Sequence, residues 1–159
     1  MLLVKTLLVA TTLGAIGLAA PTATEGPQTP QLPRTLRLTA ETTQSRAVDL
    51  PPSHHSLGDE EITSGTLLDD QGTAAGSYGA DCSLVAVYPD HALEHCTGFG
   101  SLAGGQLTFA GSSRSDLEHG TLAITGGTGV YQGARGQIQL QETGNNRTLV
   151  TVHLLDAAR

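Results

Sequence analysis

Apolar and polar residues alternate over short stretches of this chain, most clearly on both sides of one glycine cluster. In the segment Leu122–Gln141 (LAITGGTGVYQGARGQIQLQ), Leu122 and Ile124 precede the cluster. After the cluster, Ile138 and Leu140 alternate with glutamines. Alternation with a period of two places successive side chains on opposite faces of a β-sheet. We therefore predict two strands joined by a close-packed glycine turn, at which a side chain would not fit.

The same alternation predicts an all-β domain without a long amphipathic helix. The chain has 20 glycines, spread in the manner of short strands joined by tight turns. We expect strands over Thr35–Gln44, Glu60–Leu68, Ala74–Tyr78, Cys82–Tyr88, Ala92–Ser101, Gln106–Ala110, Thr121–Thr125, Gln137–Glu142 and Thr148–Leu155. This pattern alone fits either a β-barrel or a β-sandwich.

The glycine cluster admits a second interpretation, a nucleotide-binding turn. The sequence ITGGTG resembles the glycine-rich turn that opens a dinucleotide-binding fold. That fold needs a helix directly afterwards, further strand–helix units and an acidic residue about twenty positions on. The remaining chain reads as strands instead, so we predict a structural turn that contains Gly126, Gly127, Gly129, Arg135 and Gly136. We expect Arg135 to form an ion pair with a carboxylate on a neighbouring strand.

The chain begins with a stretch that has the layout of a secretory signal. Residues 1–23 contain an apolar run with one charge, Lys5, near its start and small residues at its end. Residues 24–34 are rich in proline and lack an apolar period, which indicates a solvated linker. We therefore expect a secreted protein whose single folded domain covers residues 35–159. An uncleaved membrane anchor is the alternative.

Composition narrows the chemistry that this domain can perform. The formal charge is −7, and the only lysine, Lys5, lies in the predicted signal, which excludes a Schiff-base amine or a phosphate-loop lysine in the exported chain. The acidic balance argues against nucleic acid as a partner. The six histidines form no set of three ligands at metal-binding spacing, so we expect neither a metal nor a cofactor.

The two cysteines, Cys82 and Cys96, lie on either side of a turn at Pro89–Asp90. If the hairpin pairs symmetrically about Pro89, the cysteines face each other across the strands, close enough to bridge. Export of the protein would favour oxidation of the pair. In the chain-entropy model, a bridge that closes a loop of about fifteen residues stabilises a fold by roughly 3 kcal/mol. We therefore predict a structural disulfide between them.

Several segments together resemble one protein superfamily. TLAITGGTGVYQGARGQIQLQE resembles the corresponding segment of allene oxide cyclases, and its core GGTGxYxxARG is similar to the glycine motif of dirigent proteins. Upstream, LGDE, GTLLDDQGTAAG and LEHCTGF resemble a strand start, a hairpin and the cysteine-bearing strand of the cyclases. The resemblance runs from about Leu36 to Leu155. It implies a small antiparallel β-barrel of about eight strands.

The resemblance also implies which residues line a cavity. Cys96 falls on the barrel-lining cysteine of the cyclases when LEHCTGF is laid on their strand. A bridged cysteine cannot act as a free thiol, so the disulfide and the free-thiol interpretation exclude each other. In either case this strand face is expected to line the cavity. We expect Cys96, Phe99 and Tyr131 among the lining residues.

Three residues are candidates for catalysis: Glu41, Tyr78 and Tyr88. Glu41 is the nearest match to a cavity glutamate on the first strand of the cyclases, although the accompanying asparagine of that family is absent. The alternative is that Glu41 faces solvent. Tyr78 and Tyr88 are able to donate hydrogen bonds or protons into a cavity. Alternatively, each is a core or rim residue.

From the resemblance we expect a cofactor-independent cyclase or isomerase. Such an enzyme would bind a reactive, mostly apolar polyketide- or fatty-acid-derived intermediate and direct its stereoselective ring closure by confinement. Two alternatives stay open. One is a non-catalytic dirigent-like guide of radicals made by a separate oxidase, and the other is a lipocalin-like binding barrel. Proteins of the cyclase and dirigent families are often trimers, so the resemblance also leaves room for a homo-oligomer.

Overall fold

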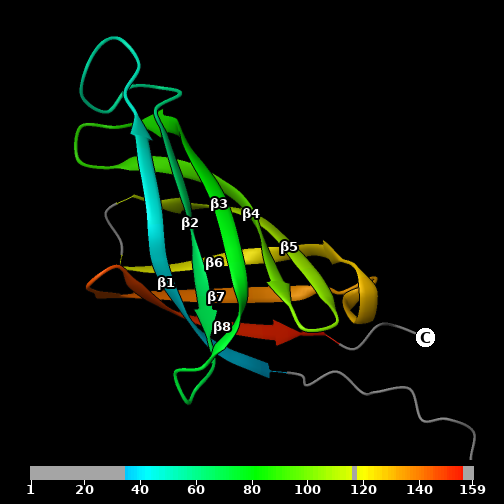
Figure 1. Cartoon of the computed structure of the whole chain (residues 1–159). Coiled ribbons are helices and arrows are strands. Elements are labelled where there is room, and N and C mark those ends of the chain that lie inside the picture. Colours follow the sequence, from blue (N-terminus) through cyan, green and yellow to red (C-terminus); the bar gives the residue numbers. More distant parts are fainter. Residues whose placement is uncertain (1–34, 116–117, 156–159) are drawn as a thin grey trace, which may run out of the picture. The chain divides into compact units, whose positions relative to one another are not determined.

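The chain folds into a closed antiparallel β-barrel of eight strands (Figure 1). The computed structural model describes residues 35–115 and 118–155, so the predicted signal (1–23) and linker (24–34) lie outside the described residues. The strands are β1 (Thr35–Val48), β2 (Glu60–Leu68), β3 (Ala74–Val87), β4 (Ala92–Leu102), β5 (Gly105–Arg114), β6 (His119–Gly127), β7 (Gly136–Gly144) and β8 (Arg147–Leu154). Each strand pairs with the next, and β8 pairs with β1 to close the barrel. The predicted fold class is confirmed.

The expected strands Ala74–Tyr78 and Cys82–Tyr88 are in fact one continuous strand, β3. The sequence between them contains Gly79, which we interpreted as a break. In the barrel, Gly79 lies opposite Phe99 of β4, and a Cβ atom at Gly79 would come within 2.9 Å of the Phe99 ring. Glycine therefore makes room for an aromatic ring here, and the strand continues through it.

The glycine cluster is a close-packed turn between β6 and β7, as predicted. Its helical content is a single 3₁₀ turn, η1 (Gly129–Tyr131), and no longer helix occurs among the described residues. Gly129 has a φ of +60°, and a Cβ atom there would collide with the carbonyl oxygen of Gly104 in the β4–β5 hairpin. The amide of Val130 donates a hydrogen bond to that same carbonyl oxygen over 2.9 Å. The cluster thus fastens one end of the barrel to a neighbouring hairpin.

This fastened end, which we call the closed end, contains the hydrophobic core. The side chain of Tyr131 is only 6% exposed and packs with apolar residues from most of the strands. The buried members of this cluster are Ala40, Leu67, Leu107, Ile124, Tyr131, Ile138, Val150 and Val152. They lie on the inner face of the barrel because alternate residues of each strand point to the same side.

The opposite end, which we call the open end, is built from strands that run past their partners. β1 continues beyond Glu41, its last pair with β8, and from there to Val48 it pairs only with β2. The loop between β1 and β2 is held by Asp59, whose carboxylate accepts hydrogen bonds from the amides of Leu50 and Ser56 at 2.8 Å each. Both hydrogen bonds lower the pKa of Asp59, the Leu50 amide having the larger effect.

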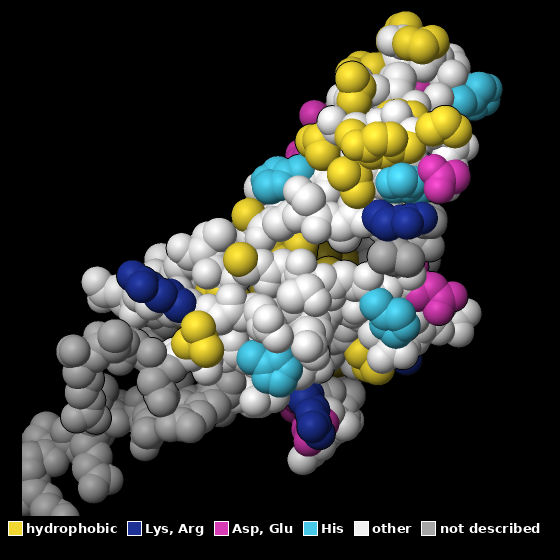
Figure 2. Space-filling view, turned by 180° about the vertical axis from the view of Figure 1, so that it is seen from behind, with side chains coloured by type: hydrophobic (Ala, Val, Ile, Leu, Met, Phe, Trp, Pro, Cys, Tyr) yellow, Lys and Arg dark blue, Asp and Glu magenta, His cyan; other side chains and the backbone are white. Residues whose placement is uncertain are grey.

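Figure 2 shows hydrophobic side chains gathered at one tip of the molecule. Exposed apolar residues of the open end include Leu57 in the β1–β2 loop and Val85 and Val87 near the end of β3.

Within residues 35–115 and 118–155, the protein has no helix with the length and hydropathy of a membrane span.

Candidate ligand cavity

The inner face of the barrel encloses a cavity of about 550 Å³ that opens between the strand ends. This volume falls within the range of about 300–1,000 Å³ that is usual for small-molecule sites. All eight strands contribute lining residues. The cavity has two chemically different parts, which correspond to the closed and open ends.

Towards the closed end the cavity is lined by aliphatic and aromatic side chains. Leu38, Leu107 and Phe109 are among them, and all three belong to the core or pack against it. One polar contact interrupts this lining: the hydroxyl groups of Tyr78 and Thr42 lie 2.6 Å apart and share a hydrogen bond. Because the Tyr78 hydroxyl is already hydrogen-bonded to Thr42, its direction is fixed. Its second hydrogen bond can therefore be formed with a guest molecule that lies in one particular orientation.

Towards the open end the lining contains carboxylates. Glu61, Glu94 and Glu142 all line the cavity. The hydroxyl of Ser45 donates a hydrogen bond to Glu61 over 3.1 Å, and the hydroxyl of Ser113 donates one to Glu94 over 3.2 Å. Burial raises the pKa of Glu94, and the negative charges of Glu61 and Glu142 raise it further, although the Ser113 hydrogen bond opposes the shift. Removal from water and nearby like charges both favour the neutral form of a carboxyl group.

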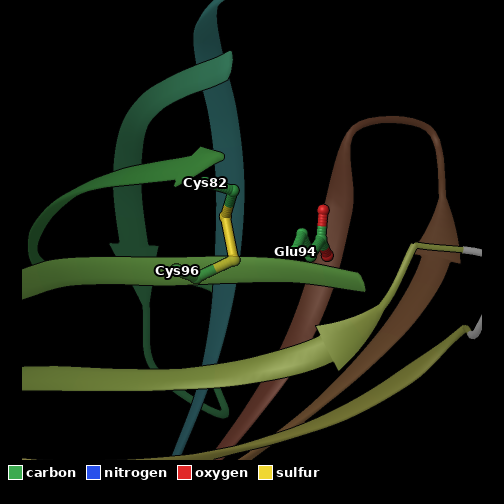
Figure 3. Close-up of side chains that lie close together, drawn as sticks. All are labelled: Cys82, Glu94 and Cys96. Carbon is green, nitrogen blue, oxygen red and sulfur yellow. A yellow bond between two sulfur atoms is a disulfide. The ribbon is translucent and has the colours of Figure 1, made fainter. Parts of the chain in front are cut away.

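The predicted disulfide is confirmed, and it forms part of the cavity wall. Cys82 on β3 and Cys96 on β4 are bonded, with their Cα atoms 4.0 Å apart, and both line the cavity. Figure 3 shows the bridge between the two strands, with Glu94 on the same strand as Cys96. One carboxylate oxygen of Glu94 and the two sulfur atoms lie within 4.8 Å of one another. Because both sulfurs are bonded to each other, they are not available as thiolate ligands for a metal ion.

The predicted register of the two cysteines is right, but the hairpin is not symmetrical about Pro89. Next to the turn, Val87 pairs with Ala92, which centres the hairpin one half-residue later than assumed. A bulge between Leu84 and Ala86 then shifts the register by one residue and brings Cys82 opposite Cys96. Without that extra residue in β3, the two cysteines would not face each other.

Glu41 does not line the cavity, so of the two positions considered for it the solvent-facing one applies and the catalytic one does not. Its neighbours Ala40 and Thr42 on β1 line the cavity, so Glu41 points to the outer face. There its carboxylate accepts hydrogen bonds from the guanidinium group of Arg147, the shorter one 2.8 Å long. The side chains of both residues are substantially exposed.

The predicted aromatic residues are divided between the cavity, the core and the surface. Tyr78 lines the cavity, whereas Tyr131 belongs to the buried core and Tyr88 is exposed and stacked on His91. Phe99 is in a strand segment that borders the cavity, but its ring covers Gly79 on the outer face and is 41% exposed. Phe99 and Gly79 each lie three positions from a bridged cysteine, and an odd spacing along a strand reverses the face.

Arg135 has a structural role through its main chain. Its carbonyl oxygen accepts a hydrogen bond from the amide of Leu155 over 2.8 Å. No ion pair joins its guanidinium group to a carboxylate within residues 35–115 and 118–155, so the expected ion pair is not found there.

Sequence reasoning missed the cavity carboxylates. The signal was present: once Cys96 is placed on the inner face, Glu94 two residues earlier must share that face. Glu61 could not have been found in this way, because its pairing with Cys82 on the neighbouring strand is known only from the structure. The resemblance to the cyclases pointed instead to a carboxylate on the first strand, Glu41.

Comparisons with known proteins agree with this barrel. The family described as "Allene oxide cyclase barrel like domain" matches residues 35–154. A solved structure described as pyocyanin demethylase is 26% identical, with a TM-score of 0.72, over 76% of this chain and 99% of that one. No curated protein gave a significant match.

Two further solved structures are similar in fold. AbnU, described as an exo-specific intermolecular Diels-Alderase, has 13% identity and a TM-score of 0.61 over 76% of this chain and 97% of that one. The pterocarpan synthase dirigent protein PsPTS1 has 13% identity and a TM-score of 0.58 over 77% of this chain and 96% of that one. The same barrel thus occurs in proteins described as catalysts and in a protein described as dirigent.

Proposed function

The chain belongs to the family of allene oxide cyclase barrel-like domains, and from that premise we propose that it is a cofactor-independent cyclase or isomerase. Its substrate would be a reactive, mostly apolar small molecule, such as a polyketide- or fatty-acid-derived intermediate. The observation that carries this proposal is the cavity of about 550 Å³, apolar towards the closed end and polar towards the open end. We also propose that the protein is exported, because its disulfide is typical of an oxidising compartment.

Confinement is the main source of rate and selectivity in this proposal. Ring closure rearranges bonds within one molecule, so substrate and product contain the same atoms and no external oxidant or reductant is consumed. A cavity that holds the reacting ends of a flexible chain near each other removes much of the entropy barrier to their reaction. The polarity difference between the two ends of the cavity would fix the direction in which the substrate enters, and hence which face reacts.

Of the three catalytic candidates from the sequence, Tyr78 is the one that lines the cavity. We propose that its hydroxyl, held by Thr42, positions an acceptor atom of the substrate. Glu41 and Tyr88 have no part in this proposal, because Glu41 pairs with Arg147 on the outer face and Tyr88 is exposed.

A dirigent-like guide is the second candidate. This candidate is favoured by the scarcity of groups that could transfer a proton at the closed end of the cavity. Of the described residues that line that part, Tyr78 is the one with a titratable side chain. A guide needs only to hold radicals that a separate oxidase has produced. A lipocalin-like carrier would need still less, namely saturable binding.

The experiment that tests the proposal measures product formation from linear substrates that carry a conjugated diene and an activated alkene. We expect wild-type protein to accelerate ring closure and to bias the ratio of stereoisomers, as measured by chiral chromatography. Ala80→Phe fills the cavity from its inner face, and we expect it to abolish both effects. Ala123→Phe is the matched control, because Ala123 is exposed on the outer face between Leu122 and Ile124.

Other outcomes would select a different function. A stereochemical bias that requires an added oxidase, with no acceleration of ring closure, would support the guide and contradict the cyclase. Saturable binding of apolar compounds without any effect on rate or stereochemistry would support the lipocalin-like carrier and contradict the other two functions.

A further inference from the structure

We propose that Glu94 is a catalytic residue of this cavity, whose carboxylic acid donates a hydrogen bond to an acceptor oxygen of the bound substrate. This inference rests on the proposed function and narrows it to substrates that carry a carbonyl group at one end of an apolar body. The carbonyl group would lie at the open end and the apolar body would extend towards Tyr78 and the closed end.

The position of Glu94 is the first argument. It lines the cavity towards the open end, near the start of β4 and two residues from the bridged Cys96. One of its carboxylate oxygens lies within 4.8 Å of both disulfide sulfurs, and the Ser113 hydroxyl holds Oε1 from β5. The Ser113 hydrogen bond and the adjacent disulfide restrict the direction of the Glu94 carboxyl group, as is needed in a group that acts on a guest.

The charges around Glu94 are the second argument. Glu61 from β2 and Glu142 from β7 share the cavity with it. Glu118, directly before β6, and His119, the first residue of β6, also line the cavity. On β3 the facing residue is Cys82, which does not titrate because it is bridged. His95 and Arg114 occupy strand positions adjacent to Glu94 and Ser113, on the outer face, and His95 binds Ser112 there. The charges that shift the pKa of Glu94 are both negative, and its pKa is raised.

The chemistry follows from these surroundings. When several carboxyl groups share a cavity, one of them tends to hold its proton. Arg147 of β8 also borders this cavity, but its guanidinium group is paired with Glu41. A protonated carboxyl group can donate a hydrogen bond, whereas an ionised one can only accept. In a ring closure that uses an alkene conjugated to a carbonyl group, negative charge accumulates on the carbonyl oxygen, and a positioned hydrogen-bond donor stabilises that charge. The proton stays on Glu94 throughout, so the step needs no partner acid or base.

The test uses two neutral fluorescent probes and three variants. N-Phenyl-1-naphthylamine lacks a carbonyl group and reports occupancy of the cavity. Prodan (6-propionyl-2-dimethylaminonaphthalene) carries a carbonyl group, and its emission moves to the red when that group accepts a hydrogen bond. Glu94→Gln keeps a donor that does not titrate, Glu94→Leu removes the donor, and Glu60→Gln changes a carboxylate that does not line the cavity.

We expect wild-type protein to bind prodan more tightly at low pH, and to lose about tenfold in affinity, together with the red shift, as pH rises through the pKa of Glu94. Glu94→Gln should keep both properties at every pH, and Glu94→Leu should lack both at every pH. Glu60→Gln should behave as wild type. Binding of N-phenyl-1-naphthylamine should be the same in all four proteins.

Three results would overturn the inference. Prodan binding by wild type that does not change with pH, or that equals binding by Glu94→Leu, means that Glu94 does not contact the carbonyl oxygen. Affinity that increases with pH means that Glu94 acts as an anion, as it would towards a cationic guest. In each of these cases normal binding of N-phenyl-1-naphthylamine leaves the proposed function intact, whereas failure of both probes to bind wild type would overturn the proposed function as well.

Discussion

The closed and open ends of this barrel share the same strands and the same inner face, yet they are built on opposite principles. At the closed end, the side chain of Tyr131 and seven other buried residues fill the interior, and the glycine turn packs against the β4–β5 hairpin. At the open end, Glu61, Glu94 and Glu142 line the cavity. Filling an interior with apolar side chains stabilises a fold, whereas placing carboxylates there costs stability. The difference indicates that the closed end stabilises the fold, and under our proposal the open end contacts the substrate.

The largest expected effect lies at the closed end. Tyr131→Ala should destabilise the protein by about 3–5 kcal/mol, because it removes a buried aromatic ring from the centre of the core cluster. Tyr88→Ala is the matched control: its ring is 49% exposed, and the loss should be below about 1 kcal/mol. Chemical denaturation followed by circular dichroism measures both. Equal losses in the two variants would mean that the glycine turn does not seal the core.

The disulfide should provide the main covalent stabilisation of the open end. Replacement of Cys82 and Cys96 by alanine together should cost about 3 kcal/mol, since the bridge closes a loop across 14 positions. Thermal unfolding should show a lower Tm, and wild-type protein reduced with dithiothreitol should unfold at the same temperature as the double variant. We also expect weaker probe binding, because both cysteines form the cavity wall. A double variant with an unchanged Tm would contradict the assignment.

Glu94 should lower the stability of the fold at neutral pH. Its pKa is raised in the folded state, mainly by burial, from an ordinary value of 4.5. As pH rises, Glu94 loses its proton in the unfolded chain at a lower pH than in the folded protein. The contribution of protonated Glu94 to the free energy of unfolding is therefore fully present below its pKa in the unfolded chain, and it is lost as pH rises through its pKa in the folded protein. Glu94→Gln does not titrate and should therefore be more stable than wild type at pH 7, by less than about 1 kcal/mol because the group is half exposed.

The measurement is the difference in Tm between Glu94→Gln and wild type as a function of pH. That difference should be smallest at low pH and increase until Glu94 is fully ionised. If Glu94→Gln is less stable than wild type at pH 7, Glu94 stabilises the cavity wall. The open end would then not differ from the closed end in the way described above.

The smallest effect is expected at the outer face. Glu41→Gln removes an exposed ion pair with Arg147, which should cost about 0.2–1 kcal/mol and less at high salt. Binding of prodan at low pH should not change in Glu41→Gln, unlike in Glu94→Leu. Loss of probe binding in Glu41→Gln would show that the outer face communicates with the cavity.

Much of the fold could be predicted from the sequence, because strands and turns depend on local patterns. Leu122, Ile124, Ile138 and Leu140 alternate, and the structure places them in two paired strands. The disulfide was also predicted, although its register depends on a bulge at Val85 that no local pattern indicated. The candidate site was predicted less well. Tyr78, Cys96 and Phe99 are among the residues that line the cavity, although the Phe99 ring covers Gly79. Glu41 and Tyr131 are not among them, and Glu94 was missed.

The sequence by itself therefore determined the strands and the glycine turn, because both depend on side-chain alternation or on sterically obligatory residues over short distances. The pairing of the two cysteines was predicted, but the bulge in β3 that brings them opposite each other is a feature of the tertiary structure. The sequence did not determine which of two alternating faces points inward. That was decided by closure of the barrel, in which β8 pairs with β1 and bulges shift the faces of β1 and β3. A shift of one residue moves every later side chain of a strand to the other face. Only the tertiary structure could therefore bring Glu61, Glu94 and Glu142, from three different strands, into one cavity.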